Sequence, residues 1–515
     1  MTRPTAPRTI VLLMVDQLAA KWLERAREGI VELPNFDALQ AEGATFRNAF
    51  STNPVCSPSR ASIATGLANV SHGVTECGYD LDPGVPTFMR GLQEAGWRTG
   101  AFGKLHHVTQ LEELAPDYTV YGYDVVANTE DLRAGEWIDW VEREHPEHYE
   151  AALSTVWMTM SEDLLDYGPE HVDLRARILA AQERFPESTE EAYELPFPAE
   201  VSQTAWITDR ACAFLADGGE RDLFAHISYV QPHNPFAPPA EFVDRVDVDA
   251  IPEPVPAEWA ERPIPYFAQE RYREPSYAQA DWRRQRQLYF ADLAHLDHEL
   301  GRVRRALDEA GRLAGALFLF TSDHGELLHD QGLLGKWERH YDPCIRVPLV
   351  VAAPGAVPGP RAELAEHTDI AATVYDWAGV EPPTLPQHTR AGERRLPMLH
   401  GRSLLPSVLG APAGGSAEAS ARDAVYIQSN NSHVEARPSS WARTVRTERF
   451  RFTYYPDGGG EQLFDLVADP DEQRNLAADP AWRSTRDELF ARLTELIIAE
   501  GFPNTPRELY RIGAW

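Results

Sequence analysis

Side chains suited to metal binding directly follow two apolar, strand-length runs of the sequence. Asp16 and Gln17 follow the run TIVLLMV. Asp323 and His324 follow the run ALFLFTS. Two carboxylates, an amide oxygen and an imidazole are ligands that suit a divalent cation, Ca²⁺ first, with Mg²⁺ or Mn²⁺ as alternatives. An Asp at a strand end can instead cap the following helix, so the residues alone leave both interpretations open.

A cysteine and an arginine stand one helical turn apart in the stretch NPVCSPSRASIATG, residues 53–66. Cys56 lies between two prolines just before an expected helix, and Arg60 follows four residues later. A nucleophile beside a metal and a fixed cation is activated by a lowered pKa. Pro58 restricts Ser57 to extended conformations, which predicts a strip open to modification before folding. The alternative is a buried, inert cysteine next to a helix N-terminus.

Four apolar runs must position these side chains. They are apolar on both faces and bounded by turn or charge signals, which is typical of buried parallel strands, at residues 9–15, 223–230, 316–322 and 347–354. Helical patterns lie between them, at residues 205–217 and 286–311. The alternation predicts an α/β fold with a large mixed, mostly parallel sheet covered by helices. Ligands gather at the carboxyl ends of such strands, so polar residues following the runs should meet there.

We divide the chain into two domains. Residues 1–420 form the α/β domain, with an acidic, Trp-bearing insertion at about 108–199 that has no clear strand rhythm. A Gly/Ala/Ser-rich stretch, residues 409–423, reads as a linker. Residues 421–515 then form a smaller C-terminal subdomain. It is expected to hold a helix at 481–501 and a small antiparallel sheet, with strands at 424–428, 441–447, 450–456 and 461–466.

The composition excludes several classes of partner. Lys and Arg number 48 against 79 Asp and Glu, a formal charge of −31, which disfavours nucleic acid and anionic membranes. The N-terminal apolar run is too short for a membrane helix, and no other run is long enough. The cysteines are too few and too widely spaced for a disulfide framework, which indicates a reducing cytoplasm: Cys56, Cys77, Cys212 and Cys344. An anionic substrate would need a local cationic pocket.

The stretch CSPSRASIATG resembles the signature of the sulfatase family, Cys-x-Pro-x-Arg followed by Thr-Gly, with every defining position filled. The resemblance implies that a separate formylglycine-generating enzyme oxidises Cys56 to formylglycine, whose hydrate carries the nucleophilic hydroxyl. It also assigns Arg60 to holding the modified side chain or the anion. The chain is therefore similar to formylglycine-dependent sulfatases of the alkaline phosphatase superfamily.

Further matches follow in the family's order along nearly the whole chain. GWRTGAFGKLH assigns Lys104 to the sulfate oxygens and His106 to the modified residue. FAHISYVQPHNPF points to His233 as a substrate or leaving-group contact, and the segment after ALFLFTS supplies Lys336. Taken singly, the lysines could be solvated surface charges, and the histidines could be loop residues whose ring nitrogens are already hydrogen-bonded. Together with Arg60 they would form the required cationic pocket.

The resemblance implies a sulfuric ester hydrolase acting on sulfate monoesters of small molecules. One hydroxyl of residue 56 attacks sulfur, Lys104 and Lys336 neutralise the equatorial oxygens, and His233 or Lys336 assists the departing alcohol. His106 then takes the proton of the second hydroxyl, which expels sulfate.

The metal-ligand pairs depart from the commonest pattern of the family. Many sulfatases have two Asp and then Asp-Asn, whereas this chain has Asp16-Gln17 and Asp323-His324. Choline sulfatases and phosphonate monoester hydrolases are members with Asp-Gln. A phosphonate monoester or phosphodiester hydrolase is therefore one alternative, and a non-catalytic binding protein of the same fold is another.

Aromatic residues of the insertion leave the organic part of the substrate open. Trp137, Trp140 and Trp157 could form a cage for a cationic group such as choline. Core packing or a subunit interface is the alternative. The C-terminal RELYRIGAW could dock on a neighbouring copy, which would make a homo-oligomer.

Overall fold

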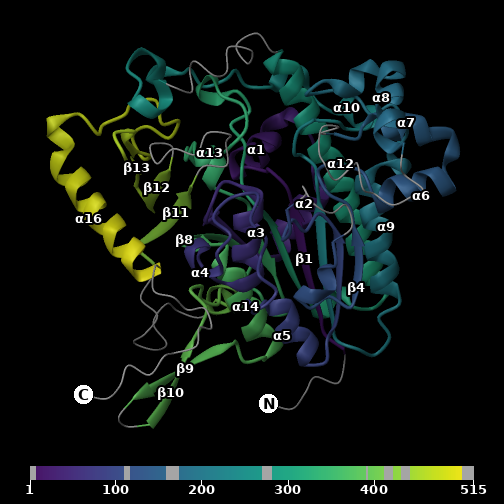
Figure 1. Cartoon of the computed structure of the whole chain (residues 1–515), viewed down its shortest axis with the longest axis horizontal. Helices are drawn as coiled ribbons and strands as arrows, with labels where there is room; N and C mark the ends of the chain where they lie inside the picture. The colour runs from purple at the N-terminus through teal and green to yellow at the C-terminus, as the bar shows by residue number, and fades with distance from the viewer. Residues whose placement is uncertain are drawn as a thin grey trace.

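The computed structural model describes residues 7–109, 116–157, 173–268, 281–389, 392–410, 422–430 and 441–500. An eight-stranded sheet forms its centre, in the order β4-β3-β5-β1-β6-β7-β2-β8 (Figure 1). The strands are β1 Thr9–Val15, β2 Ala44–Phe50, β3 Arg98–Gly103, β4 Val125–Asn128, β5 Leu223–Tyr229, β6 Ala316–Ser322, β7 Leu349–Ala352 and β8 Gly359–Glu366. The predicted α/β fold with a large mixed, mostly parallel sheet is confirmed.

The register of the central strands fixes where the functional side chains emerge. β1 pairs in parallel with β5 on one side and β6 on the other, so that Val15 lies beside Tyr229 and Ser322. β3 pairs in parallel with β5, and Gly103 lies beside Ser228. The residues that follow these strands therefore start from one edge of the sheet.

Two predictions about the strands are wrong. β7 was expected to be parallel, but it runs antiparallel to both β6 and β2. Between β6 and β7 the longest helix is the four-residue α13 (Asp342–Ile345), so the chain makes no crossover and returns from the edge at which it left. The insertion was expected to lack strand rhythm, yet it contributes β4, which pairs in parallel with β3. Four residues are too few for a periodic signal.

Helices cover both faces of the sheet. Successive residues of β1 point to opposite faces, so alternate residues of this strand belong to two different apolar clusters. Val11, Leu13 and Val15 belong to one apolar cluster, into which helices α2, α9 and α12 pack. Ile10, Leu12 and Met14 belong to the other, with α3, α5 and α14. These helices are α2 Pro34–Glu42, α3 Cys56–Thr65, α5 Phe88–Glu94, α9 Gln203–Ala216, α12 Trp282–Glu309 and α14 Thr368–Ala378.

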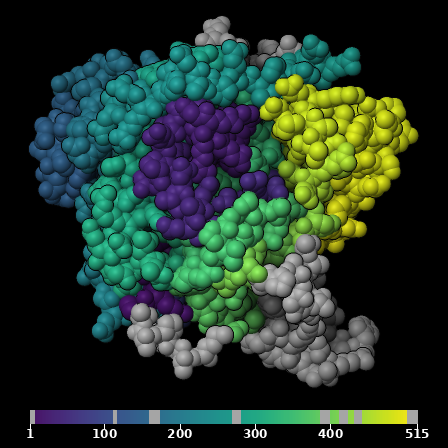
Figure 2. Space-filling model, turned by 180° about the vertical axis from the view of Figure 1, so that it is seen from behind, coloured from purple at the N-terminus to yellow at the C-terminus, as the bar shows by residue number. Residues whose placement is uncertain are grey.

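Seven further helices complete this part of the described chain. They are α1 Ala20–Arg25, α4 Asn69–His72, α6 Glu136–Glu144, α7 Tyr149–Ser154, α8 Leu174–Arg184, α10 Ala240–Val243 and α15 Leu405–Val408. α6, α7 and α8 belong to the insertion, shown in blue at the side of the molecule opposite the yellow C-terminal residues (Figure 2). Trp137 and Trp140 of α6 are buried in the same cluster as β1, which supports core packing for these two.

The C-terminal residues form the predicted antiparallel sheet, in the order β11-β12-β13-β14. Its strands are β11 Ala424–Ser429, β12 Ala442–Thr447, β13 Phe450–Tyr455 and β14 Gly460–Asp465, and helix α16 (Arg483–Glu500) packs on it. A separate hairpin joins β9 (Thr384–Thr389) to β10 (Gly392–Pro397). The predicted linker lies largely outside the described residues, as does the C-terminal RELYRIGAW. Within the described ranges, none of the helices could cross a membrane.

Candidate active site

Three of the predicted metal ligands converge at the carboxyl edge of the sheet. Asp16 follows β1, while Asp323 and His324 follow β6, the strand beside it. Together with Cys56 they form a buried group, in which one ligand atom from each residue lies within 4.8 Å of the others. Carboxylate oxygens with an imidazole nitrogen at this spacing suit a divalent cation.

Gln17, the remaining predicted ligand, adopts a left-handed backbone conformation beside this group, with φ 64°. Its side-chain nitrogen donates to Glu326 at 2.5 Å and to Asn234 at 3.3 Å. Its Oε1 is buried and, within the part of the chain that the structure describes, has no hydrogen-bond partner. A buried acceptor left unpaired costs free energy unless another group satisfies it. The donor set of these residues therefore fits a hard divalent cation.

Helix α3 begins at Cys56, and all ten of its residues are buried. In the folded protein both Ser57 and Pro58 belong to the helix, so the extended strip predicted for the chain before folding stays a prediction. Pro58 lies in the first turn, where backbone N–H groups have no acceptor within the helix, so a proline there removes no hydrogen bond. Gly66 ends the helix in the left-handed conformation, with φ 68°.

Cations and hydrogen bonds surround the thiol of Cys56. Its Sγ lies 3.1 Å from Lys336 Nζ and 3.1 Å from His324 Nε2. Burial raises the pKa of this thiol, but a hydrogen bond with Cys77 and the charges of Lys104 and Lys336 hold that pKa well below its ordinary value. Position 56 is thus a place where an anionic nucleophile is stabilised.

Arg60 ties α3 to the ends of the strands. Its guanidinium donates to Asp323 at 2.7 Å and to Asp16 at 3.1 Å. It also donates to the backbone oxygen of Lys104 at 2.7 Å and to Ser228 Oγ at 2.9 Å. Burial lowers the pKa of Arg60, and the two carboxylates raise it above its ordinary range. Arg60 therefore keeps its charge and holds the ends of four strands together.

Lys104 follows β3 and is fully buried between two carboxylates. Its Nζ lies 2.5 Å from Asp16 Oδ2 and 2.5 Å from Asp131 Oδ2. Burial lowers the pKa of Lys104, while Asp131 and Asp16 raise it well above its ordinary value. The predicted cations do gather at one place, as expected for an anion site, but acidic side chains already balance much of their charge.

Asp131 is a site residue that the sequence analysis missed. It comes three residues after β4, the strand next to β3. The rule that polar residues at strand ends form the site would have selected Asp131 if β4 had been recognised.

The structure places the two remaining predicted histidines, His233 and His106, differently. His233 lies near the group: its charge acts on Asp16 and Asp131, and its ring centroid is 6.0 Å from that of Trp157. His106 follows Lys104 by two residues and has a left-handed backbone, φ 52°. Its Nδ1 is buried without a hydrogen-bond partner among the described residues, and no described contact joins it to Cys56.

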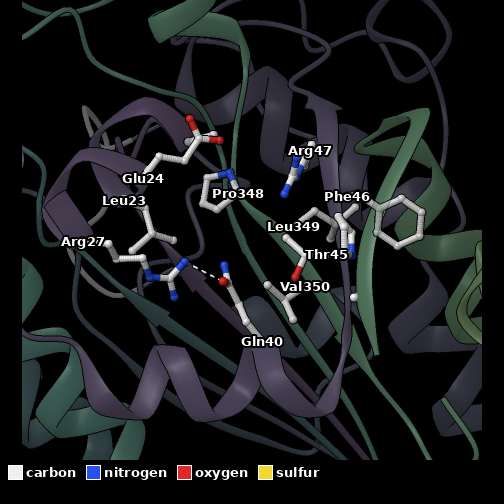
Figure 3. A pocket seen from close by; sticks show the side chains of 13 residues that line it. Leu23, Glu24, Arg27, Gln40, Thr45, Phe46, Arg47, Pro348, Leu349 and Val350 are labelled. Atoms are coloured by element: carbon white, nitrogen blue, oxygen red, sulfur yellow. Dashed lines mark hydrogen bonds between the residues drawn. The ribbon is translucent and has the colours of Figure 1, made fainter. Parts of the chain in front are cut away.

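A separate hollow of about 490 Å³ lies away from this group, between α1, α2 and strands β2 and β7 (Figure 3). Arg27 and Gln40 line it and hydrogen-bond to each other across it. Arg27 also pairs with Asp37 at 2.6 Å. Its lining residues include none of the predicted site residues.

Known proteins match this sequence along nearly the whole chain. The family model for sulfatases matches residues 8–380, and a model described as N-sulphoglucosamine sulphohydrolase, C-terminal, matches residues 332–499. A multifunctional alkaline phosphatase superfamily protein, PehA, of Trinickia caryophylli is 28% identical, and the match covers 92% of each chain. An arylsulfatase of Clostridium perfringens is 27% identical over 93% of this chain and 92% of the relative. A choline-sulfatase of Rhizobium meliloti is 27% identical over 92% and 83%.

Solved structures with the same fold include two phosphonate monoester hydrolases. The enzyme of Agrobacterium radiobacter superposes with a TM-score of 0.74 at 23% identity, and that of Silicibacter pomeroyi with 0.75 at 24%. Each match covers 96% of both chains. At these identities the likeness shows a shared fold.

Proposed function

Because the chain belongs to the sulfatase family, we propose that it is a sulfuric ester hydrolase that cleaves sulfate monoesters of small molecules. The observation that carries the proposal is the position of Cys56. Cys56 is the first residue of a buried helix, and its Sγ lies 3.1 Å from Lys336 Nζ and from His324 Nε2. The carboxylates of Asp16 and Asp323, which suit a divalent cation, lie beside it. Conversion of Cys56 to formylglycine by a formylglycine-generating enzyme would place an aldehyde hydrate among these groups.

The proposed cofactors are a divalent cation, Ca²⁺ first with Mg²⁺ or Mn²⁺ as alternatives, and the modified residue 56. The ligands would be Asp16, Gln17, Asp323, His324 and residue 56. Mutual distances support Asp16, Asp323, His324 and residue 56, and a buried Oε1 without a hydrogen-bond partner among the described residues supports Gln17. When present, the cation stabilises negative charge, and the aldehyde hydrate supplies a nucleophilic hydroxyl and a second hydroxyl whose deprotonation releases sulfate.

The remaining residues have roles that follow from where their charges lie. Lys104 and Lys336 hold the oxygens of the sulfate group, and both are buried, where electrostatic stabilisation is strongest. Arg60 fixes the carboxylates and the backbone of Lys104. His233, or Lys336 through Nζ, donates a proton to the oxygen of the departing alcohol. His106 is proposed to accept a proton on its imidazole, whose Nδ1 has no hydrogen-bond partner in the described part of the chain.

A second candidate function is hydrolysis of phosphonate monoesters or phosphodiesters on the same site. The pair Asp16-Gln17 is compatible with it, because family members with Asp-Gln include phosphonate monoester hydrolases as well as choline sulfatases. Lys104 and His106 favour the sulfatase, because they complete its Lys-x-His segment. A non-catalytic binding protein is disfavoured by the completeness of the polar set.

The test is turnover of a panel of aryl, choline and sugar sulfates and an aryl phosphonate monoester. The enzyme is made with and without a formylglycine-generating enzyme, and intact mass reports the state of residue 56. We expect sulfate hydrolysis by the modified form alone, lost with chelator and restored by a divalent cation. Cys56→Ala should abolish it, and Cys212→Ala, at a half-buried thiol on α9, should leave it unchanged. Full turnover by the unmodified or Cys56→Ala protein would refute the mechanism.

The partners and the cellular location of the protein are proposed on the same basis as its function. The chain would need a maturation enzyme and a small sulfate ester, and a homo-oligomer remains part of the proposal. A cytoplasmic location is supported by four cysteines that are all free thiols.

A further inference from the structure

Asp131 contacts the predicted sulfate-binding lysine directly. It follows β4, whose Asn128 pairs with Gly103 of β3, so Asp131 and Lys104 start from the same edge of the sheet. Both carboxylate oxygens accept from Lys104 Nζ, at 2.6 and 2.5 Å. The same nitrogen lies 2.5 Å from Asp16. Lys104 therefore bridges a predicted metal ligand and a second carboxylate.

Asp131 is the least buried of the three side chains in this bridge. The side chains of Asp16 and Lys104 are fully buried, whereas 10% of the Asp131 side chain is exposed. Burial raises the pKa of Asp131, but Lys104 and His233 lower it to below its ordinary value, so the carboxylate is charged at neutral pH. An anion held by Lys104 and His233 therefore meets the negative charge of Asp131.

We propose that Asp131 is a specificity-determining residue that makes the site prefer singly charged tetrahedral ester anions to doubly charged ones. The inference rests on the proposed function, because it assumes that Lys104 binds the anionic group of an ester. Sulfate monoesters and phosphonate monoesters carry one negative charge at pH 8, whereas phosphate monoesters carry two.

The effect of Asp131 on an ester anion depends on the charge of that anion. The Coulomb energy between a fixed charge and an anion is proportional to the charge of the anion. Asp131 therefore opposes a phosphate monoester twice as strongly as a sulfate monoester. A unit charge a few ångströms away in a partly buried site changes an ionic equilibrium by tenfold or more. Removing the charge of Asp131 should change the ratio of the two substrates by at least about tenfold.

The experiment measures kcat/KM at pH 8 for three esters of one leaving group, 4-nitrophenyl sulfate, phosphate and phenylphosphonate. The metal-loaded, formylglycine-containing enzyme is compared with Asp131→Asn. We expect kcat/KM for the phosphate, relative to the sulfate, to rise by about tenfold or more. The ratio of phosphonate to sulfate, two singly charged esters, should change by less than about threefold.

Three further variants separate charge from geometry. Asp131→Glu keeps the charge and should keep the wild-type ratio, whereas Asp131→Ser removes it and should behave like Asp131→Asn. Asp217→Asn removes a charge that is 79% exposed, at the C-terminus of α9, and should change no ratio. The inference is wrong if both neutral variants keep the phosphate-to-sulfate ratio within about twofold of wild type, or if Asp131→Glu shifts it as much as they do.

Failure of the proposed function has a different signature. A modified, metal-loaded wild-type enzyme that hydrolyses no sulfate ester would refute that function. The ratio of phosphate to phosphonate would then still test Asp131, because these esters also differ by one charge.

Discussion

Arg60 shows how one side chain can organise a site that contains several acidic side chains. It makes two buried ion pairs and donates to the backbone after β3, with none of its side chain exposed. A planar guanidinium with several donors suits this task better than an ammonium group, because each donor meets a different acceptor. Arg60 thus joins the strand ends and also neutralises the buried carboxylates beside it.

Replacement of Arg60 should be costly even in the metal-free protein. Arg60→Leu leaves Asp16 and Asp323 buried without this cation, and breaking a buried pair in this way costs about 3–5 kcal/mol. The measurement is the free energy of unfolding in denaturant, with chelator present. Arg143→Leu is the control, because its pair with Glu144 is exposed and worth at most about 1 kcal/mol. Equal costs for the two variants would contradict the role given to Arg60.

Buried histidines predict a loss of stability in mild acid. His295 on α12 is 1% exposed, and burial, with nearby cationic groups, lowers its pKa from 6.5 to about 3. Between these values the unfolded chain takes up a proton and the folded chain does not. Stability from this residue is therefore complete above pH 6.5 and falls by about 1.4 kcal/mol per pH unit below it.

The variant His295→Leu isolates this contribution. The free energy of unfolding of the wild type, minus that of the variant, should fall by about 1.2 kcal/mol between pH 6 and pH 5. Denaturant unfolding at a series of pH values measures it, and titrations shared by both proteins cancel in the difference. A difference that stays constant from pH 7 to pH 5 would show that His295 keeps an ordinary pKa.

At the scale of elements, strand ends place most of the chemistry. The seven-residue apolar runs of β1 and β6 were predicted with their observed bounds, and both pairs of predicted metal ligands follow them. Long runs that are buried on both faces carry a strong signal. The site could be read from the sequence to the extent that its residues follow such runs or lie in motifs.

Other elements left weaker signals. β2 and β8 mix buried with exposed positions, and β8 carries charged residues, so neither resembles a buried run. The direction of β7 depends on where the preceding loop folds, which a pattern of four residues does not encode. Asp131 was missed with β4, and Glu326 was missed because its contact is with the side chain of Gln17, a pairing of distant residues.

The turn after β3 depends on a close approach of two strands. Gly103 has φ +95°, and a Cβ there would lie 2.0 Å from the backbone oxygen of Ser228. Gly103→Ala should push β3 away from β5 and displace Lys104, so we expect both stability and kcat to fall, kcat by about tenfold or more. Gly96→Ala is a matched control, with φ +89° and no atom within 4 Å. It should cost about 1–2 kcal/mol from backbone strain and leave kcat unchanged. Equal effects on kcat would disprove the role of the close contact.

At the scale of the whole molecule, the C-terminal sheet supports the loop that carries Lys336. An apolar cluster joins Phe50, Tyr341 and Ile345 of the main domain to Val425 and Tyr455 of this sheet. The Tyr455 hydroxyl donates to the backbone oxygen of Glu338 at 3.0 Å, two residues after Lys336. The smaller sheet is therefore part of what shapes the site.

Neighbouring tyrosines on opposite faces of β13 test this support. Tyr455→Ala removes a buried aromatic side chain and the hydrogen bond, so we expect a loss of about 3–5 kcal/mol and a fall in kcat of at least about tenfold. Tyr454→Ala, which loses its contact with Phe490 of α16, should lower stability but leave kcat unchanged. Denaturant unfolding and kcat for an aryl sulfate measure both effects. A normal kcat for folded Tyr455→Ala would show that the sheet does not govern the site.

The complete burial of α3 has a consequence for timing. A second protein that acts on Cys56 needs to grip the main chain around it, and the folded protein offers none of that chain. The proposed conversion of the thiol would therefore have to precede the packing of α3. A molecule that folded first would keep its cysteine for the lifetime of its fold, so the modified fraction of a preparation would reflect the relative rates of modification and folding.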